Sequence, residues 1–259
     1  MVERGVEEPL YRQLAAELGG QIRSGVYRVG DRIPSEAELQ EQHGISRETV
    51  RLAMNLLRVE GLVTIRQGSG TFAADPKTAR MPYRASVVHS AAVRAQRPGL
   101  DAFRAELKAL GREGFQDLRV ERVPAPEEIA SRLGLEPGEP VVVRRHRQEV
   151  EGQPYALVDS WFAAELADGT PLAENVKVPG GTDALMARMG WEALTRTDEV
   201  TARMPTPEEA QELVIAGGVP VVIVVATELA AGGKPVEVYT RVHPANRFVL
   251  VYEVSKADR

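Results

Sequence analysis

The chain has 259 residues, of which 43% are hydrophobic and 27% are charged, and its formal net charge is -5. This length allows two domains with cores of their own, and this composition excludes a disordered or fibrous protein. The sequence contains no cysteine, which excludes disulfides and thiolate metal sites. It also contains no run of 18 consecutive apolar residues and no apolar signal-peptide core, so we expect a cytoplasmic protein without a membrane partner.

Apolar spacing predicts a first helix over residues 9–25. Leucine and isoleucine recur there at every fourth position, so they share one face of the helix, which we expect to be buried. These residues are Leu10, Leu14, Leu18 and Ile22.

The segment of residues 34–72 predicts two more helices and a hairpin. Ser35 followed by Glu38 forms a capping box, which starts a short helix, and Gly44 ends that helix. Ser46 can then cap a longer helix.

The longer helix is expected to run to about Val59. Residues 62–72 then alternate on either side of Gly68 and Gly70, as the two strands of a hairpin do. Two helices joined by a glycine-containing turn and followed by a hairpin predict a winged helix-turn-helix. In this motif the second helix enters the major groove of DNA.

The distribution of charge matters more than the net value for DNA binding. Residues 1–75 carry nine arginines and eleven acidic residues, a net charge of -2, whereas residues 43–72 carry four arginines and two glutamates, a net charge of +2. This basic footprint is small, so we expect two copies of the chain to bind DNA together as a homodimer.

Three arginines of the longer helix, Arg47, Arg51 and Arg58, fall within roughly 40° of one another at 100° per residue. This flank can face phosphates and base edges. The alternative is a solvated face without a binding role, and the flanking turn and wing favour the DNA-binding interpretation.

Residues 8–73 resemble the winged helix-turn-helix of the GntR family of bacterial transcription regulators. The resemblance rests on PLYRQLAAELGGQIRSGVYRVGDRIPSEAEL and SRETVRLAMNLLRVEGLVTIRQGSGTF. It implies that double-stranded operator DNA is a partner, approached by hydroxyls, arginines and the wing tip. The DNA-binding residues that it implies are Ser35, Ser46, Arg47, Thr49, Arg51, Gln67 and Gly68.

Two residues depart from the family pattern. Leu52 and Leu56 stand where the family usually has polar residues. They are expected to pack against a partner or the second domain, and the alternative is simple exposure to solvent.

Residues 75–99 contain prolines and basic residues without periodicity, which predicts a linker. It would join a DNA-binding domain at residues 1–74 to a second domain at residues 100–259. The second domain alternates helices with strands, and we predict an α+β fold whose mainly antiparallel sheet has its helices on one side. The predicted helices are 101–110, 126–133, 182–189 and 207–214, and the predicted strands are 117–123, 140–150, 155–161, 198–203, 219–229, 235–242 and 248–254.

Residues 100–255 resemble the UTRA effector-binding domain of the HutC subfamily of GntR regulators, which shares a fold with chorismate lyase. The motifs are RHRQEVEGQP, DEVTARMPTPEEAQEL and KPVEVYTRVHPANRF. The resemblance implies that the domain binds a small-molecule effector. It also implies that Arg145 and Arg147 bind an acidic or phosphate group of this effector. The implied effector-binding residues are Arg145, Arg147, Thr182, Glu237 and His243.

Each of these assignments has a structural alternative. Arg145 and Arg147 point to the same face of a strand, where they could instead form salt bridges with Glu237 or Glu149. Thr182 could only cap a helix, and His243 could be a structural histidine. Ala184 replaces an aromatic residue of the sugar-phosphate-binding relatives, so a carboxylated metabolite is equally open.

The sequence therefore predicts a ligand-responsive repressor that binds a palindromic operator as a homodimer, without a cofactor or a metal. The four histidines are scattered and lack the i, i+4 spacing of a metal site. The alternative is an enzyme, with a chorismate-lyase-like domain tethered to DNA, since fold does not fix function. Against it, no Ser/His/Asp order, carboxylate pair or phosphate-binding glycine loop is recognisable.

Overall fold

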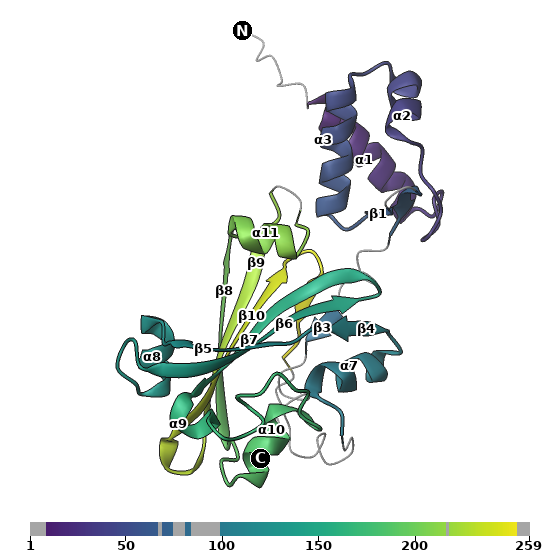
Figure 1. Cartoon of the computed structure of the whole chain (residues 1–259). Helices are drawn as coiled ribbons and strands as arrows, with labels where there is room; N and C mark the ends of the chain where they lie inside the picture. The colour runs from purple at the N-terminus through teal and green to yellow at the C-terminus, as the bar shows by residue number, and fades with distance from the viewer. Residues whose placement is uncertain (1–8, 67–68, 75–80, 84–98, 216–217, 253–259) are drawn as a thin grey trace, which may run out of the picture. The chain divides into compact units, whose positions relative to one another are not determined.

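The computed structural model describes residues 9–66, 69–74, 81–83, 99–215 and 218–252 (Figure 1). The chain divides into two compact units. One comprises residues 1–81 with 216–219, and the other comprises residues 82–215 with 220–259.

The first unit begins with three helices, α1 (Leu10–Arg23), α2 (Glu36–His43) and α3 (Arg47–Val59). The predicted capping box at the start of α2 is present, and Ser46 caps α3. Gly44 ends α2 in the left-handed conformation, with φ of 62°, which glycine adopts at no steric cost. The capping signals of the sequence therefore located both helices of the helix-turn-helix.

A two-stranded wing follows, in which β1 (Val63–Arg66) pairs antiparallel with β2 (Gly70–Ala73). The apolar faces of α1 and α3 pack together with the start of the wing. Gly19 lies at this contact, because a Cβ atom there would come within 3.2 Å of Leu62 and 3.4 Å of Leu57. The fully or almost fully buried core residues include Leu14, Leu18, Leu39, Val50, Ala53, Leu57 and Leu62.

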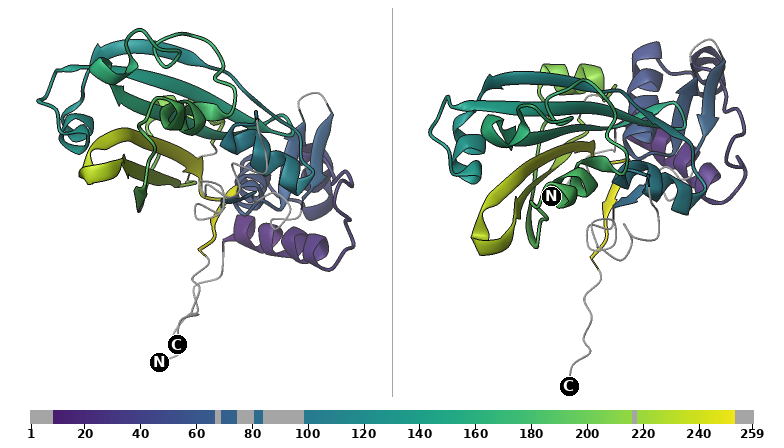
Figure 2. Two further views of the ribbon diagram at one scale, coloured as in Figure 1. Left: turned by 90° about the horizontal axis from the view of Figure 1, so that it is seen from below. Right: turned by 60° about the horizontal axis from the view of Figure 1, so that its bottom comes forward.

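The second unit is built on a seven-stranded sheet in the order β4-β6-β7-β10-β9-β8, with β5 also paired to β6. All of its pairings are antiparallel, as predicted. Figure 2 shows how the sheet twists along its length. Its strands are β4 (Gly114–Gln116), β5 (Arg119–Pro124), β6 (Pro140–Val150), β7 (Gln153–Ala163), β8 (Thr195–Arg203), β9 (Val221–Leu229) and β10 (Pro235–Pro244).

Helices cover both faces of this sheet, which corrects the prediction that they lie on one side. Helix α8 (Glu127–Leu133) packs on the face that carries Val141 and Val143 of β6. The opposite face, which carries Val142, packs against α9 (Ala164–Ala167) and α10 (Gly181–Arg188). The unit also contains α7 (Ala102–Leu110), α11 (Pro207–Glu212) and the short 3-10 helix η1 (Ala231–Gly233).

The last predicted strand does not join the large sheet. Strand β11 (Phe248–Leu250) pairs instead with β3 (Met81–Tyr83), of which Pro82 and Tyr83 are the first residues of the second unit. Tyr83 and Phe248 lie in contact there, with ring centroids 6.1 Å apart. The two strands lie about 165 residues apart in sequence, so no local sequence pattern indicates that they pair. Strands of three residues are also too short to show a periodicity.

No helix within the described ranges is long and apolar enough to cross a membrane.

Candidate functional site

The first turn of α3 presents hydroxyls that can meet DNA. Ser46 Oγ accepts a hydrogen bond from the Thr49 main-chain N–H at 3.1 Å, and the two hydroxyl oxygens lie 2.8 Å apart. Ser46 is exposed even though it caps the helix. Helix N-termini attract anions because their free N–H groups and the helix dipole both favour negative charge. A phosphate is therefore a suitable partner for this turn.

The two predicted DNA-binding arginines of α3 are also accessible. The side chain of Arg47 is 79% exposed and that of Arg51 is 59% exposed. Arg47 Nε lies 3.6 Å from Glu36, whereas Arg51 donates to both carboxylate oxygens of Glu48, at 3.1 and 2.8 Å. Exposed pairs of this kind contribute little to stability, so contacts to DNA can replace them.

The other predicted DNA contacts differ in how the structure places them. Ser35 is half-buried, and its hydroxyl donates to Glu38 at 2.7 Å within the capping box. Gln67 and Gly68 lie outside the described residues. Of the two departures from the family pattern, Leu56 packs against the core of the first unit and Leu52 is exposed.

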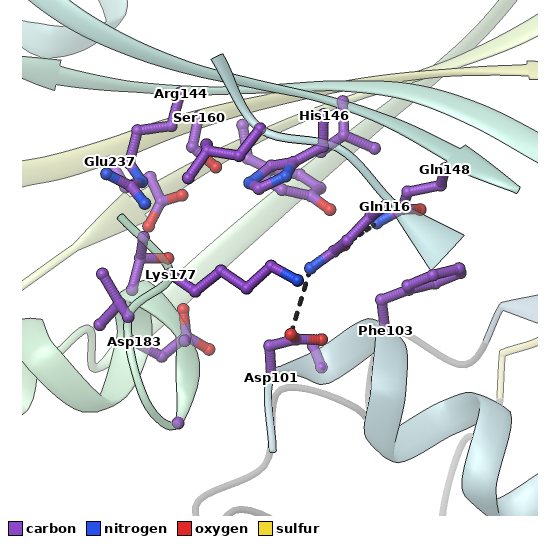
Figure 3. A pocket seen from close by; sticks show the side chains of 18 of the residues that line it. Asp101, Phe103, Gln116, Arg144, His146, Gln148, Ser160, Lys177, Asp183 and Glu237 are labelled. Atoms are coloured by element: carbon purple, nitrogen blue, oxygen red, sulfur yellow. Dashed lines mark hydrogen bonds between the residues drawn. The ribbon is translucent and has the colours of Figure 1, made fainter. Parts of the chain in front are cut away.

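The second unit contains a cavity of about 120 Å³, lined by the sheet and by the starts of α7 and α10 (Figure 3). A protein cavity of about 150 Å³ can hold benzene, so this one can hold a small molecule or part of one. The benzene-binding cavity is lined by apolar side chains, whereas most of the side chains labelled around the present cavity in Figure 3 are polar. The lining includes Asp101, Phe103, Gln116, Arg144, His146, Gln148, Ser160, Lys177, Thr182, Asp183, Arg196, Glu228, Glu237, Tyr239 and Arg241.

Arg144 builds one wall of the cavity. Its guanidinium group is buried and donates to four main-chain oxygens, at 3.0 Å (Pro171), 2.8 Å (Leu172), 2.9 Å (Glu174) and 2.7 Å (Val176). The segment that it holds runs directly into the lining residues of the α10 start. Burial lowers the pKa of Arg144, and the nearby carboxyl group of Glu237 opposes this effect.

Three carboxyl groups gather on another side of the cavity, and we refer to Asp183, Glu228 and Glu237 as the carboxylate cluster. Each offers an oxygen, and these atoms lie within 4.8 Å of one another. Burial raises the pKa of Glu237 well above its usual range, and the charges of Glu228 and Asp183 raise it further. The cluster could hold a cation or hydrogen-bond donors, although Arg196 already pairs with Glu228 at 2.9 Å.

A chain of amide and carboxyl groups forms the part of the lining near α7. Gln148 Nε2 donates to Gln116 Oε1, and Gln116 Nε2 donates to Asp101 Oδ2, both at 3.1 Å. His146 Nδ1 lies 2.6 Å from the main-chain oxygen of Asp117, and burial lowers the pKa of the His146 ring. Figure 3 shows the Lys177 side chain extending across the cavity toward Asp101.

The structure brings two of the five predicted effector-binding residues to this cavity, Thr182 and Glu237. Thr182 is the second residue of α10 and does not cap it, because Gly180 occupies the cap position. His243 is fully buried outside the lining, between the rings of Tyr155 and Phe248, and burial lowers its pKa well below the usual value.

Arg145 and Arg147 do not line the cavity. They lie on the other face of β6, where Arg145 pairs with Asp159 at 3.2 Å and stacks over Trp161. Arg147 pairs with Glu149 at 2.5 Å, which is one of the two salt-bridge alternatives for this pair of arginines. The anion-binding role therefore has no support from the cavity at these two positions.

Sequence reasoning missed Arg144, His146 and Gln148, which alternate with the predicted arginines on β6. The alternation was visible in the sequence, and the predicted Arg145 and Arg147 lie on the face opposite to the one that lines the cavity. The run of three valines, residues 141–143, is buried on both faces and gives no indication of which face holds a ligand.

Comparison with known proteins agrees with this two-part architecture. Residues 10–73 match the model of bacterial regulatory proteins of the gntR family, and residues 110–249 match the UTRA domain. The chain belongs to the GntR family and carries a UTRA domain. It is a transcription regulator rather than an enzyme, which settles the alternative that the sequence left open.

Two relatives match almost the whole chain, and another matches less than one third of it. An uncharacterised HTH-type transcriptional regulator of Streptomyces coelicolor is 32% identical over 257 residues, covering 96% of this chain and 94% of that one. An HTH-type transcriptional regulator of Mycobacterium tuberculosis is 31% identical and covers 93% of this chain and 84% of its own. The histidine utilization repressor of Klebsiella aerogenes is 47% identical over 74 residues, 29% of this chain and 31% of its own.

Solved structures show the same fold. A GntR-family transcriptional regulator superposes with a TM-score of 0.59 at 30% identity, over 97% of this chain and 99% of its own. PhnF from Mycobacterium smegmatis also has a TM-score of 0.59, at 22% identity, over 94% of this chain and all of its own.

Proposed function

We propose that this regulator is a repressor that binds a palindromic operator as a homodimer, and that a small polar metabolite in the cavity changes its affinity for the operator. The observation that carries the proposal is a cavity, lined by charged and hydrogen-bonding as well as apolar side chains, within the UTRA domain of a chain whose other unit is a winged helix-turn-helix. A regulator of this kind needs a coupling of only ~1–3 kcal/mol, which changes affinity about 5- to 150-fold.

The DNA-binding part of the proposal assigns the operator contacts to the exposed start of α3. Arg47, Arg51, Ser46 and Thr49 lie there, and Ser35, Gln67 and Gly68 complete the set expected from the sequence. One copy presents few basic groups, so two copies on two half-sites supply the phosphate contacts that a single wing and helix lack.

The ligand part of the proposal favours a molecule with both an anionic group and hydrogen-bond donors. An acidic or phosphate group would meet Lys177 and the first turn of α10, where Thr182 lies. Hydroxyl or N–H groups of the same molecule would meet the carboxylate cluster. Arg144 supports the wall of the site, because both of its Nη groups donate to main-chain oxygens.

The test has two stages. A duplex is first selected from a random DNA library by the full chain, and its symmetry and the protein-to-DNA ratio are measured. Acidic and phosphorylated metabolites are then screened by thermal shift, since a ligand that binds only the folded state raises the melting temperature. The proposal fails if the selected duplex lacks two-fold symmetry, or if metabolites that raise the melting temperature leave its affinity unchanged.

A further inference from the structure

Tyr83 connects the effector-binding unit to the segment that leads from the winged helix. Strand β3, residues 81–83, is the first described element after residue 74, and Tyr83 is fully buried in the second unit. Its main-chain oxygen accepts a hydrogen bond from the Val251 N–H at 3.0 Å, next to β11. The anchoring of Tyr83 therefore fixes where the connecting chain enters this unit.

Arg196 of β8 holds the Tyr83 side chain from the sheet. Its Nη2 donates to the Tyr83 hydroxyl at 3.1 Å. The same guanidinium group donates through Nη1 to Glu228 at 2.9 Å and through Nε to Asp198 at 2.7 Å. All three nitrogens of Arg196 thus have partners, and only 14% of its side chain is exposed.

The tyrosine ring has a second cationic neighbour. The guanidinium group of Arg241 lies over the ring of Tyr83, 4.5 Å from its centroid. Arg241 contacts the ring face and Arg196 contacts the hydroxyl, so the removal of the hydroxyl would interrupt only the second contact. The variant Tyr83→Phe can therefore separate the two interactions.

Glu228 joins this arrangement to the cavity. It belongs to the carboxylate cluster and lines the cavity, and Arg196 lines it as well. A guanidinium group has fixed donor geometry, so a change in one of its partners alters the alignment of the others. A ligand N–H or O–H group that donates to Glu228 Oε1, the oxygen that accepts from Arg196, would compete with Arg196 for this acceptor.

We propose that Arg196 couples the ligand cavity to β3, because a ligand donor that engages Glu228 loosens the hold of Arg196 on Tyr83. Arg196 acts here as a positioning residue for the connecting segment. The inference rests on the proposed function, in which the cavity holds the ligand and β3 leads to the DNA-binding unit. It names the atoms through which a ligand in the cavity would change the position of the connecting chain.

The experiment uses the ligand-free full chain and replaces the acid itself. Glu228→Gln keeps the shape of the side chain and removes the charge that aligns Arg196. Hydrogen exchange at the Val251 amide should then rise roughly tenfold or more, the effect of losing one charged hydrogen bond. Hydrogen exchange at the amides of the β6–β7 pairing is the internal reference, because a global loss of stability would raise exchange there as well.

Two further variants make the result specific. Tyr83→Phe should raise exchange at Val251 as Glu228→Gln does, and the double variant should add little to either single one, because both changes break the same contact. Glu199→Gln is the matched control, since Glu199 lies on β8, as Arg196 does, but pairs with Arg132 at 2.6 Å. Unchanged exchange in Glu228→Gln, an equal rise in Glu199→Gln, or additive effects would each overturn the coupling.

DNA binding then tests whether the coupling regulates. Glu228→Gln and Tyr83→Phe should shift affinity for the selected duplex in the same direction and by a similar factor, while Glu199→Gln should not shift it. A rise in exchange at Val251 without any shift in affinity would overturn the regulatory role of Arg196. Failure to select a duplex would instead count against the proposed function, and the exchange data would still decide the link from Glu228 to Tyr83.

Discussion

The guanidinium group of Arg144 lies 2.8 Å from the main-chain oxygen of Leu172, 28 residues further along the chain. Three more main-chain oxygens of the same segment accept from this one side chain. The loop before α10 would otherwise bury carbonyl groups without donors, and unsatisfied buried groups cost about 1–3 kcal/mol each. Arg144 thus shapes the cavity mainly by holding its wall.

The first prediction concerns this wall. Arg144→Ala should lower the free energy of unfolding by about 3–5 kcal/mol, because the buried oxygen of Leu172 and the part-buried oxygens of three neighbouring residues lose their donor. At roughly 2–4 °C per kcal/mol for a domain of this size, the melting temperature should fall by about 6–20 °C.

Arg145→Ala is the matched control for this prediction. Arg145 is half-exposed and holds no main-chain oxygens of the loop, so the loss should be clearly smaller than in Arg144→Ala. Calorimetry on both variants distinguishes the two neighbours, and an equal loss in both would show that the loop does not depend on Arg144.

This pair of arginines also shows where sequence reasoning succeeded and where it failed. The capping signals at Ser35 and Ser46 located the starts of α2 and α3, because caps depend on residues three positions apart. The boundaries of β6 were also predicted, since its valine run and the following turn are local features.

The features that the sequence did not predict depend on residues that are far apart in the chain. Which face of β6 borders the cavity depends on where α8 and α10 pack, and alternation within the strand is the same in either case. The partners of Arg144 are main-chain atoms of residues 171–176, and main-chain atoms carry no sequence signal. Tyr83 likewise gains its role from Arg196, 113 residues away.

A second prediction separates capping from DNA binding at Ser46. Aspartate is as good an N-cap as serine, so Ser46→Asp should retain the stability of α3. Its negative charge at the exposed helix start should repel phosphate and weaken DNA binding at least tenfold. Ser46→Ala should instead lose about 1 kcal/mol of stability. Thermal melts and binding isotherms on both variants measure the two effects, and retained affinity in Ser46→Asp would place the phosphate elsewhere.

A third prediction concerns pH. Burial raises the pKa of Asp159 from 3.8 to about 6, although Arg145 opposes this effect. The folded state therefore keeps this proton up to about pH 6, whereas the unfolded chain releases it near pH 4. Between these values the group lowers stability as pH rises, by about 2–3 kcal/mol in total.

Asp159→Asn removes this titration. The variant should match the parent near pH 4 and become more stable than the parent as pH rises to 7, as urea unfolding at several pH values would measure. Glu199→Gln is a control of opposite sign, because a hydrogen bond from Arg132 lowers the pKa of Glu199. The parent should be more stable than Glu199→Gln at neutral pH, and this difference should disappear as pH falls below 4–5. A constant difference between Asp159→Asn and the parent would exclude the raised pKa.

The last prediction concerns the pair of Arg51 and Glu48 on α3. Hydrogen bonding to Arg51 lowers the pKa of Glu48, so the pair is charged at neutral pH and competes with DNA for the guanidinium group. Arg51→Ala should weaken binding to the selected duplex by ~1–3 kcal/mol and, if the contact is to a base, relax discrimination at one position. Glu48→Gln should tighten binding, because it frees Arg51 and removes a negative charge near the phosphates.

Binding measured against salt concentration distinguishes the two kinds of contact. Loss of a phosphate contact in Arg51→Ala would reduce the slope of log affinity against log salt concentration by about one, whereas loss of a base contact would not. If Arg51→Ala leaves affinity, discrimination and salt slope unchanged, Arg51 belongs to a solvated face of α3 and the DNA contact lies elsewhere.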